Sequence, residues 1–94
     1  MNIIWTKTAE ITLNEIIDYI ENDFGLLVAE SYYSDVVETI KDIENLPELF
    51  PVYQLRNDTR KAVINKKTIL YYKISDDKIY LLAFYDVRKN THKF

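Results

Sequence analysis

The stretch Ala9–Pro47, AEITLNEIIDYIENDFGLLVAESYYSDVVETIKDIENLP, decides the fold that this sequence predicts. In its first half, apolar residues recur at the spacing of one helical face, at Ala9, Leu13, Ile16, Ile17 and Ile20. In its second half, steps of four, three, four and three link Ala29, Tyr33, Val36, Ile40 and Ile43. Gly25 can end the first helix, and Pro47 must end the second because proline donates no hydrogen bond to the helical ladder. We therefore predict an antiparallel helical hairpin whose second helix runs from about Leu27 to Leu46.

Strand-forming segments precede and follow this hairpin in the sequence. Asn2–Thr6 is rich in β-branched and aromatic residues, and Thr6 or Thr8 can cap the first helix. The later strands are predicted at Val52–Arg56, Arg60–Asn65, Thr68–Ser75 and Lys78–Arg88, with turn residues between the last three.

The last of these strands is apolar on both faces, so we expect it to be central in the sheet. One face is predicted to hold Ile79, Leu81, Ala83 and Val87, and the other Leu82 and Phe84. The predicted class is α+β, with an N-terminal strand and the helical hairpin packed on an antiparallel β-meander.

Length and composition narrow the classes of protein to consider. The 94 residues predict a single domain spanning 1–94. The absence of cysteine and the single histidine, His92, exclude thiolate and histidine-rich metal sites, and no cofactor is expected. The N-terminus lacks the basic and apolar regions of a signal peptide, so we expect a cytoplasmic protein that does not engage a membrane.

Charge is divided unequally between the two halves of the chain. Residues 1–50 hold two basic and eleven acidic side chains, a net charge of −9, whereas residues 51–94 hold ten basic and four acidic ones, a net charge of +6. The second half therefore suits an anionic partner, either nucleic acid or an acidic polypeptide. A simpler explanation is that helices favour glutamate while lysine protects strand edges.

The order of strand, helix, helix and antiparallel meander resembles the RelE/ParE toxin family over nearly the whole chain. The segments that carry the resemblance are Ile4-Trp5-Thr6 running into Ala9, Ile17-x-Tyr19-Ile20, Leu46-Pro47, Arg60, Ile69–Ile74, Ile79–Tyr85 and Asp86-Val87-Arg88. The resemblance implies the toxin of a bacterial type II toxin–antitoxin system, which inhibits growth or stabilises plasmids. It also implies a cognate antitoxin that wraps the toxin with a helix and an added strand, and a hetero-oligomer of the two.

One branch of this family cuts mRNA in the ribosome and another poisons DNA gyrase. The residues at the site are therefore needed to distinguish the two activities. For the nuclease branch the resemblance implies basic residues on the first long strand, where Arg60 or Lys61 fits but Ala62 replaces a second one. That branch also carries an arginine where this chain has Ile69. Arg60 and Lys61 can equally mark a solvated strand end.

The remaining nuclease candidates follow the last strand. Arg88 and Lys89 match a late basic pair, and His92 stands where a terminal tyrosine or histidine is expected. Arg88 can instead pair with Asp86, and His92 can belong to a frayed terminus.

Tyrosines complete the candidate set. Tyr72 and Tyr85, together with Lys89, are candidate binding residues, although tyrosines on a sheet also serve packing. Because the middle-strand arginine is missing, a ParE-like toxin that binds DNA gyrase is preferred. The alternatives are a ribosome-dependent mRNA endoribonuclease that uses Arg60, Lys61, Arg88 and His92, and an inactive scaffold that binds only its antitoxin.

Overall fold

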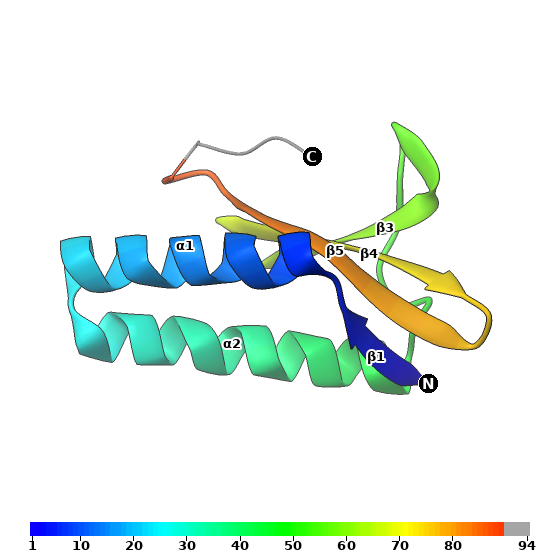
Figure 1. Cartoon of the computed structure of the whole chain (residues 1–94), viewed down its shortest axis with the longest axis horizontal. Helices are drawn as coiled ribbons and strands as arrows, with labels where there is room; N and C mark the ends of the chain where they lie inside the picture. The colour runs from blue at the N-terminus through cyan, green and yellow to red at the C-terminus, as the bar shows by residue number, and fades with distance from the viewer. Residues whose placement is uncertain (90–94) are drawn as a thin grey trace.

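Two helices pack on a five-stranded sheet in the computed structural model, which describes residues 1–89 (Figure 1). The elements are β1 (Asn2–Trp5), α1 (Lys7–Phe24), α2 (Leu26–Asn45), β2 (Val52–Tyr53), β3 (Arg56–Ile64), β4 (Thr68–Ser75) and β5 (Lys78–Asp86). The helices lie side by side along one face of the sheet, and the β2–β3 hairpin rises away from them. Neither helix in residues 1–89 is both long and apolar enough to cross a bilayer.

The predicted helical hairpin is confirmed almost residue for residue. Thr6 caps α1, since its hydroxyl oxygen accepts a hydrogen bond of 3.1 Å from the Ala9 amide. Gly25 alone separates the helices, and its φ of 95° lies in a region that residues with a side chain avoid. The chain can therefore reverse direction within one residue, which forces the two helices to lie antiparallel.

The apolar stripe predicted for α2 is wrong at one position. Tyr32 is in the core with 4% of its surface exposed, whereas Tyr33 is 51% exposed. A step of three or four residues from buried Ala29 is equally helical, so two adjacent tyrosines satisfy the same pattern. The rotation of α2 over the sheet decides between them, and this rotation is a tertiary property.

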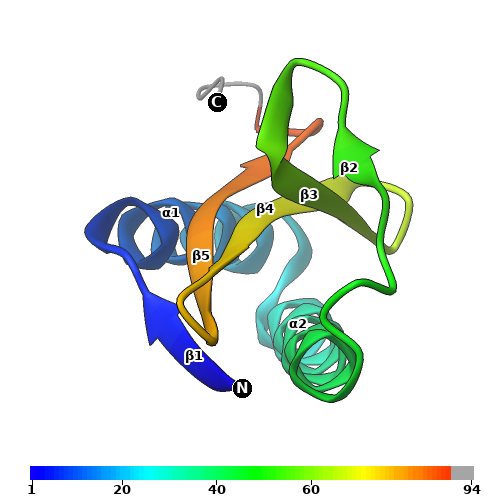
Figure 2. The ribbon, with the colours of Figure 1, turned by 90° about the vertical axis from the view of Figure 1, so that its right-hand side faces the viewer.

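The sheet has the strand order β1-β5-β4-β3-β2 and is mixed rather than wholly antiparallel. Strands β2 to β5 form the predicted antiparallel meander. The N-terminal strand, however, pairs with β5 in parallel, with Asn2 opposite Lys78 and Trp5 opposite Leu81. This pairing makes β5 an interior strand, as predicted, and Figure 2 shows β1 at the edge beside it.

A β-bulge in β5 changes which residues face the helices. Tyr71 is opposite Ala83 and Tyr72 is opposite Leu81, so Leu82 is an extra residue. After the bulge Phe84, rather than Ala83, joins Leu81 in the core. The predicted face shared by Leu81, Ala83 and Val87 is therefore wrong, because a strict alternation takes no account of a bulge.

Strand ends also differ from those predicted. The strand β2 stops at Tyr53, β3 begins at Arg56 instead of Arg60, and β5 ends at Asp86 instead of Arg88. The connections Asn65-Lys66 and Asp76-Asp77 have positive φ at both residues, the geometry of tight two-residue hairpins. The predicted turns are therefore confirmed.

The second face of the sheet has no helical layer, and we call it the open face. Alternation along β3, β4 and β5 places on it Lys61, Val63, Ile69, Tyr71, Lys73, Tyr80, Ala83 and Tyr85. Tyr71 and Ala83 are nevertheless buried, whereas Val63 is exposed and the other five are half-buried. The open face is thus a packed aromatic surface bordered by lysines.

Candidate functional site

Arg60 faces the helices rather than the open face. Its Nη1 donates hydrogen bonds to the carbonyl oxygens of Phe50 (2.7 Å) and Glu48 (3.4 Å). Its Nη2 also lies 3.9 Å from Oε2 of Glu48. The guanidinium therefore holds the connection between α2 and β2 in place.

Tyr72, a predicted binding residue, lies opposite Arg60 and is fully buried. Its hydroxyl donates a 2.7 Å hydrogen bond to the carbonyl oxygen of Pro47, in the same connection. Burial raises the pKa of the Tyr72 phenol, so the hydroxyl stays protonated as a donor. In this position Tyr72 supports the fold and offers no surface to a partner.

Lys61 lies on the open face among tyrosines. Its Nζ is 5.7 Å from the centroid of the Tyr53 ring, and the rings of Tyr53 and Tyr71 are 5.0 Å apart. Lys73 stands in the same relation to Tyr80, with Nζ 5.8 Å from the ring centroid. Cation–π contacts hold both ammonium groups above aromatic faces, where they remain available to an anionic partner.

Ile69, which stands where the nuclease branch has an arginine, is part of an apolar row across the open face. It is opposite Val63 on β3 and opposite Tyr85, a predicted binding residue, on β5. The row that contains Ile69 thus presents aliphatic and aromatic groups rather than a cation.

Arg88 is bound to Asp86. Its Nε and Nη2 donate to the two carboxylate oxygens at 2.9 and 2.8 Å, and its backbone amide donates a third bond of 2.9 Å. Thr68 donates a further hydrogen bond to the same carboxylate, which is fully buried. Burial alone would raise the pKa of Asp86, but the hydrogen bonds from Arg88 and Thr68 outweigh it and lower the pKa.

Aromatic residues of the helical hairpin surround this pair. The guanidinium carbon of Arg88 lies 6.0 Å from the ring centroids of both Phe24 and Tyr32. Burial raises the pKa of Tyr32 to about 12. The neighbouring Lys89 donates its backbone amide to the Asp86 carbonyl oxygen at 3.2 Å, which closes a turn after β5. Arg88 therefore joins the end of β5 to the helices.

The predicted catalytic residues do not meet at one point. Arg60 is level with Tyr72 across the sheet, whereas Arg88 follows Asp86, which is opposite Thr68, four residues or about 13 Å farther along β4 at 3.3 Å per residue. Lys61 lies on the face opposite to Arg60, and His92 lies outside the described residues. These residues were predicted from their order in the chain. That order does not determine on which face of the sheet, or near which end of it, each side chain lies.

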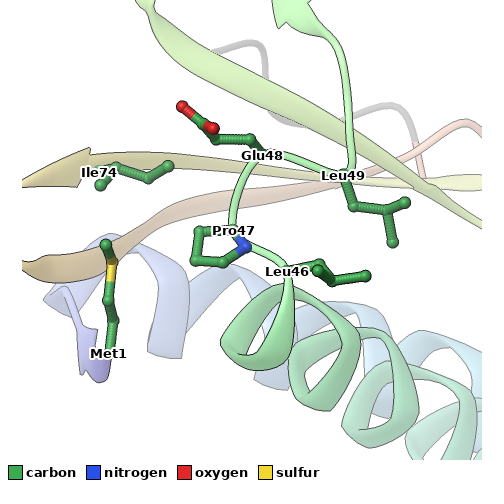
Figure 3. A pocket seen from close by; sticks show the side chains of 6 residues that line it. All are labelled: Met1, Leu46, Pro47, Glu48, Leu49 and Ile74. Atoms are coloured by element: carbon green, nitrogen blue, oxygen red, sulfur yellow. The ribbon is translucent and has the colours of Figure 1, made fainter.

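An apolar pocket that the sequence did not predict lies beneath the α2–β2 connection (Figure 3). It has a volume of about 510 Å³ and is lined by Met1, Leu46, Pro47, Glu48, Leu49 and Ile74. We call it the Pro47 pocket. Leu46 and Leu49 are 61% and 53% exposed, so large apolar surface remains in contact with water. The two leucines around Pro47, outside any helical stripe, were the available signal in the sequence.

Comparison with known proteins places the chain among toxins. The sequence model of the family described as "ParE toxin of type II toxin-antitoxin system, parDE" matches residues 3–90. A solved chain described as "Chromosomal ParDE TA system from P. aeruginosa" is 19% identical, with a TM-score of 0.80 over 93% of this chain and 96% of that one. The conserved hypothetical protein HP0892 from Helicobacter pylori is 18% identical, with a TM-score of 0.54 over 95% and 97%. Comparison with curated protein sequences gave no match.

Proposed function

Because the chain belongs to the ParE toxins of type II toxin–antitoxin systems, we propose that it inhibits growth by binding DNA gyrase and that a cognate antitoxin neutralises it. In this proposal the toxin is not a nuclease. It acts in the cytoplasm and is stored as a hetero-oligomer with its antitoxin.

The observation that supports this proposal is that both candidate arginines form hydrogen bonds with other residues of the protein. Cutting RNA requires cations that surround the phosphate as charge develops. Arg60 is bound to the carbonyl oxygens of Glu48 and Phe50, and Arg88 is bound to Asp86, near different ends of the sheet. A phosphate at Arg60 would have to compete with the carbonyl oxygens of Glu48 and Phe50, and one at Arg88 with the Asp86 carboxylate. The arrangement favours binding over catalysis.

The open face is the surface that we assign to the target. Tyrosine contributes strongly to protein interfaces because it combines apolar area with a polar group. Lys61, Lys73 and Tyr80 are half-buried there, so their positions are already restricted before a partner binds. Their positive charge also suits an acidic surface of the target.

The Pro47 pocket is the surface that we assign to the antitoxin. An apolar pocket of about 510 Å³ can accept one or more large side chains of a partner. The similar P. aeruginosa chain comes from a chromosomal ParDE toxin–antitoxin system, which is consistent with an antitoxin beside the present chain. The pocket lies beneath residues 46–49, away from Lys61, so antitoxin and target contacts can be altered separately.

The experiment that tests the proposal combines a gyrase assay with toeprinting of translated mRNA. The purified chain is expected to inhibit gyrase supercoiling and to trap cleaved plasmid DNA, while mRNA on ribosomes stays intact. Cuts at codon positions that disappear in the Arg88→Ala variant would instead establish an endoribonuclease. Antitoxin binding without either effect would identify an inactive scaffold.

A further inference from the structure

Another cavity lies where the first half of α2 meets the turn between β3 and β4 and the residues that follow β5. It has a volume of about 360 Å³, and we call it the Arg88 cavity. It is lined by Leu27, Val28, Ser31, Tyr32 and Asp35 of α2, by Asn65 and Lys67 of the turn, and by Arg88. It shares no residue with the Pro47 pocket or with the open face.

The hydroxyl of Tyr32 is a buried polar group in the wall of this cavity. It forms no hydrogen bond with any of residues 1–89, although Tyr32 is only 4% exposed. Burial raises the pKa of Tyr32 to about 12, so the hydroxyl is protonated and can donate. The nearby Thr68 hydroxyl partly opposes this rise in pKa, but it donates to Asp86 rather than to Tyr32. An acceptor bound in the cavity would satisfy the Tyr32 hydroxyl.

Two cations supply further donors to the same cavity. Arg88 uses Nε and Nη2 to bind Asp86, and its Nη1 makes no hydrogen bond with the described part of the chain. Lys67 is exposed, and within residues 1–89 its ammonium group forms no ion pair of 4.0 Å or less. A guanidinium edge beside an ammonium group is suited to bind an oxyanion.

The surrounding charges favour an oxyanion with a single negative charge. Lys67 and Arg88 are balanced by Asp35, which lines the cavity, and by the buried Asp86. Asp35 also accepts a hydrogen bond from the side-chain amide of Asn65. A phosphate dianion would be repelled by both carboxylates. A ligand carboxylate carries half that charge and needs only Nη1, so Asp86 can keep its bonds to Arg88.

The wall contributed by the start of α2 is apolar. Leu27 is 80% exposed and Val28 is 43% exposed, so a ligand that covers them removes apolar surface from water. The volume of about 360 Å³ is near the lower end for small-molecule sites, which suits a compact ligand. A compact group that fits this wall is a branched aliphatic one.

We propose that the Arg88 cavity binds a monocarboxylate attached to a branched apolar group. The carboxylate lies between Nη1 of Arg88 and the ammonium group of Lys67, and it accepts a hydrogen bond from the Tyr32 hydroxyl. The apolar group covers Leu27 and Val28. Both a free branched-chain acid and the C-terminus of a peptide that ends in leucine carry this combination. The inference goes beyond the proposed function, which depends on the open face and the Pro47 pocket.

The test titrates the full-length chain with small probes and follows the NMR shifts of its backbone amides. Isocaproate represents a free acid, and a tripeptide that ends in leucine represents a C-terminus. Both are expected to shift the amides of Val28, Lys67 and Arg88, and the tighter binder identifies the source of the carboxylate. The same tripeptide with a C-terminal amide, and inorganic phosphate, should bind about tenfold more weakly or not at all.

Two neighbouring lysines give a matched pair of variants. Lys67→Gln removes a cation from the cavity and should weaken isocaproate binding by about fivefold or more. Lys66→Gln makes the same change in net charge one residue away, at an exposed position outside the cavity, and should weaken it by less than about twofold.

Tyr32→Phe removes only the hydroxyl group. Because this hydroxyl has no partner within residues 1–89, the variant should unfold at the same urea concentration as the unaltered chain or at a higher one. It should nevertheless bind isocaproate about threefold more weakly, or worse. These two measurements together distinguish a hydroxyl that binds a ligand from one that stabilises the fold.

Several results would overturn the inference. An absence of shifts at Val28, Lys67 and Arg88 with both acids would show that the cavity binds no carboxylate. Equal binding of the tripeptide and its amide would mean that the apolar group alone is recognised. Equal weakening by the two lysine variants would mean that the probe senses only net charge. A less stable Tyr32→Phe variant with unchanged affinity would assign the hydroxyl to the fold. None of these results would bear on gyrase inhibition.

Discussion

Asp86 and Arg88, two residues apart at the end of β5, are joined by two parallel hydrogen bonds that satisfy both carboxylate oxygens. The carboxylate is fully buried, whereas the arginine side chain is 19% exposed. The pair holds the last turn of the described chain against Phe24 and Tyr32 of the helical hairpin. Arg88 is therefore part of the structural framework, which bears on how its variants should be interpreted.

Replacing the buried carboxylate should destabilise the protein. In Asp86→Asn, Arg88 loses its ionic partner and Thr68 loses a charged acceptor. We expect a loss of about 2 kcal/mol in the free energy of unfolding, measured with urea. The control Asp76→Asn, in an exposed turn, should change it by less than about 0.5 kcal/mol. Equal stability of both variants would contradict a structural role for Asp86.

The contribution of Asp86 should also depend on pH. Its pKa is lower in the folded protein than its ordinary value of 3.8, so folding favours the ionised form. The stabilisation is therefore complete above about pH 4 to 5 and is lost as the pH falls through the lowered pKa. The stability difference between the unaltered chain and Asp86→Asn should shrink as urea titrations are moved from pH 7 towards pH 2. A difference that stays constant over this range would show that the charge of Asp86 is not involved.

Thr12 should contribute to the stability of the fold because its hydroxyl accepts a hydrogen bond from a backbone amide next to the β-bulge. Its hydroxyl oxygen accepts a 2.9 Å hydrogen bond from the amide of Phe84 and is buried. Thr12→Val keeps the shape but leaves that amide unpaired, which should cost about 1–3 kcal/mol in thermal or urea unfolding. Thr39→Val is the matched control, since the Thr39 hydroxyl donates only within its own helix. A smaller effect at Thr12 than at Thr39 would rule out this account.

The Pro47 pocket should decide affinity for the antitoxin. Leu46→Ser/Leu49→Ser removes apolar surface that is already exposed, so the free chain should keep its stability to within about 1 kcal/mol. Affinity for the antitoxin encoded beside the chain should fall by about tenfold or more in a calorimetric titration. Leu55→Ser, in the exposed turn before β3, is the control and should bind as tightly as the unaltered chain. Unchanged binding by the double variant would place the antitoxin elsewhere.

The open face should decide activity against the target. Lys61→Gln/Lys73→Gln removes both ammonium groups that lie over tyrosine rings. The concentration needed for half-inhibition of gyrase supercoiling should rise by about tenfold or more. Lys41→Gln, on the exposed surface of α2, should leave that concentration unchanged. Full activity of the double variant would exclude the open face as the target surface.

The sequence predicts local features of this fold well and long-range features less well. Gly25 and Pro47 act through the chain immediately next to them, so the end of α1 and both ends of α2 could be predicted to within about a residue, whereas the sequence left the cap of α1 open between Thr6 and Thr8. The choice between Tyr32 and Tyr33 depends on the rotation of α2 over the sheet, and the bulge at Leu82 depends on pairing with β4. Neither the rotation of α2 nor the position of the bulge can be predicted from the local pattern of apolar and polar residues.

The same distinction explains the candidate site. The basic residues Arg60, Lys61 and Arg88 could be selected by type and order in the chain. Whether each one faces the helices or the open face follows from strand register, and their intramolecular partners come from other segments. The Phe50 carbonyl oxygen that binds Arg60 is one such partner, and no sequence pattern identifies it.

The parallel pairing of β1 with β5 has a consequence for synthesis of the protein. Asn2–Trp5 reaches its place only when Lys78–Leu81 is available, so β1 is translated before β5 but can pair only after β5 has been made. The helical hairpin, whose contacts are local, can form while the remaining chain is still being translated. A chain whose translation stops before residue 78 therefore has a β1 with no strand to pair with.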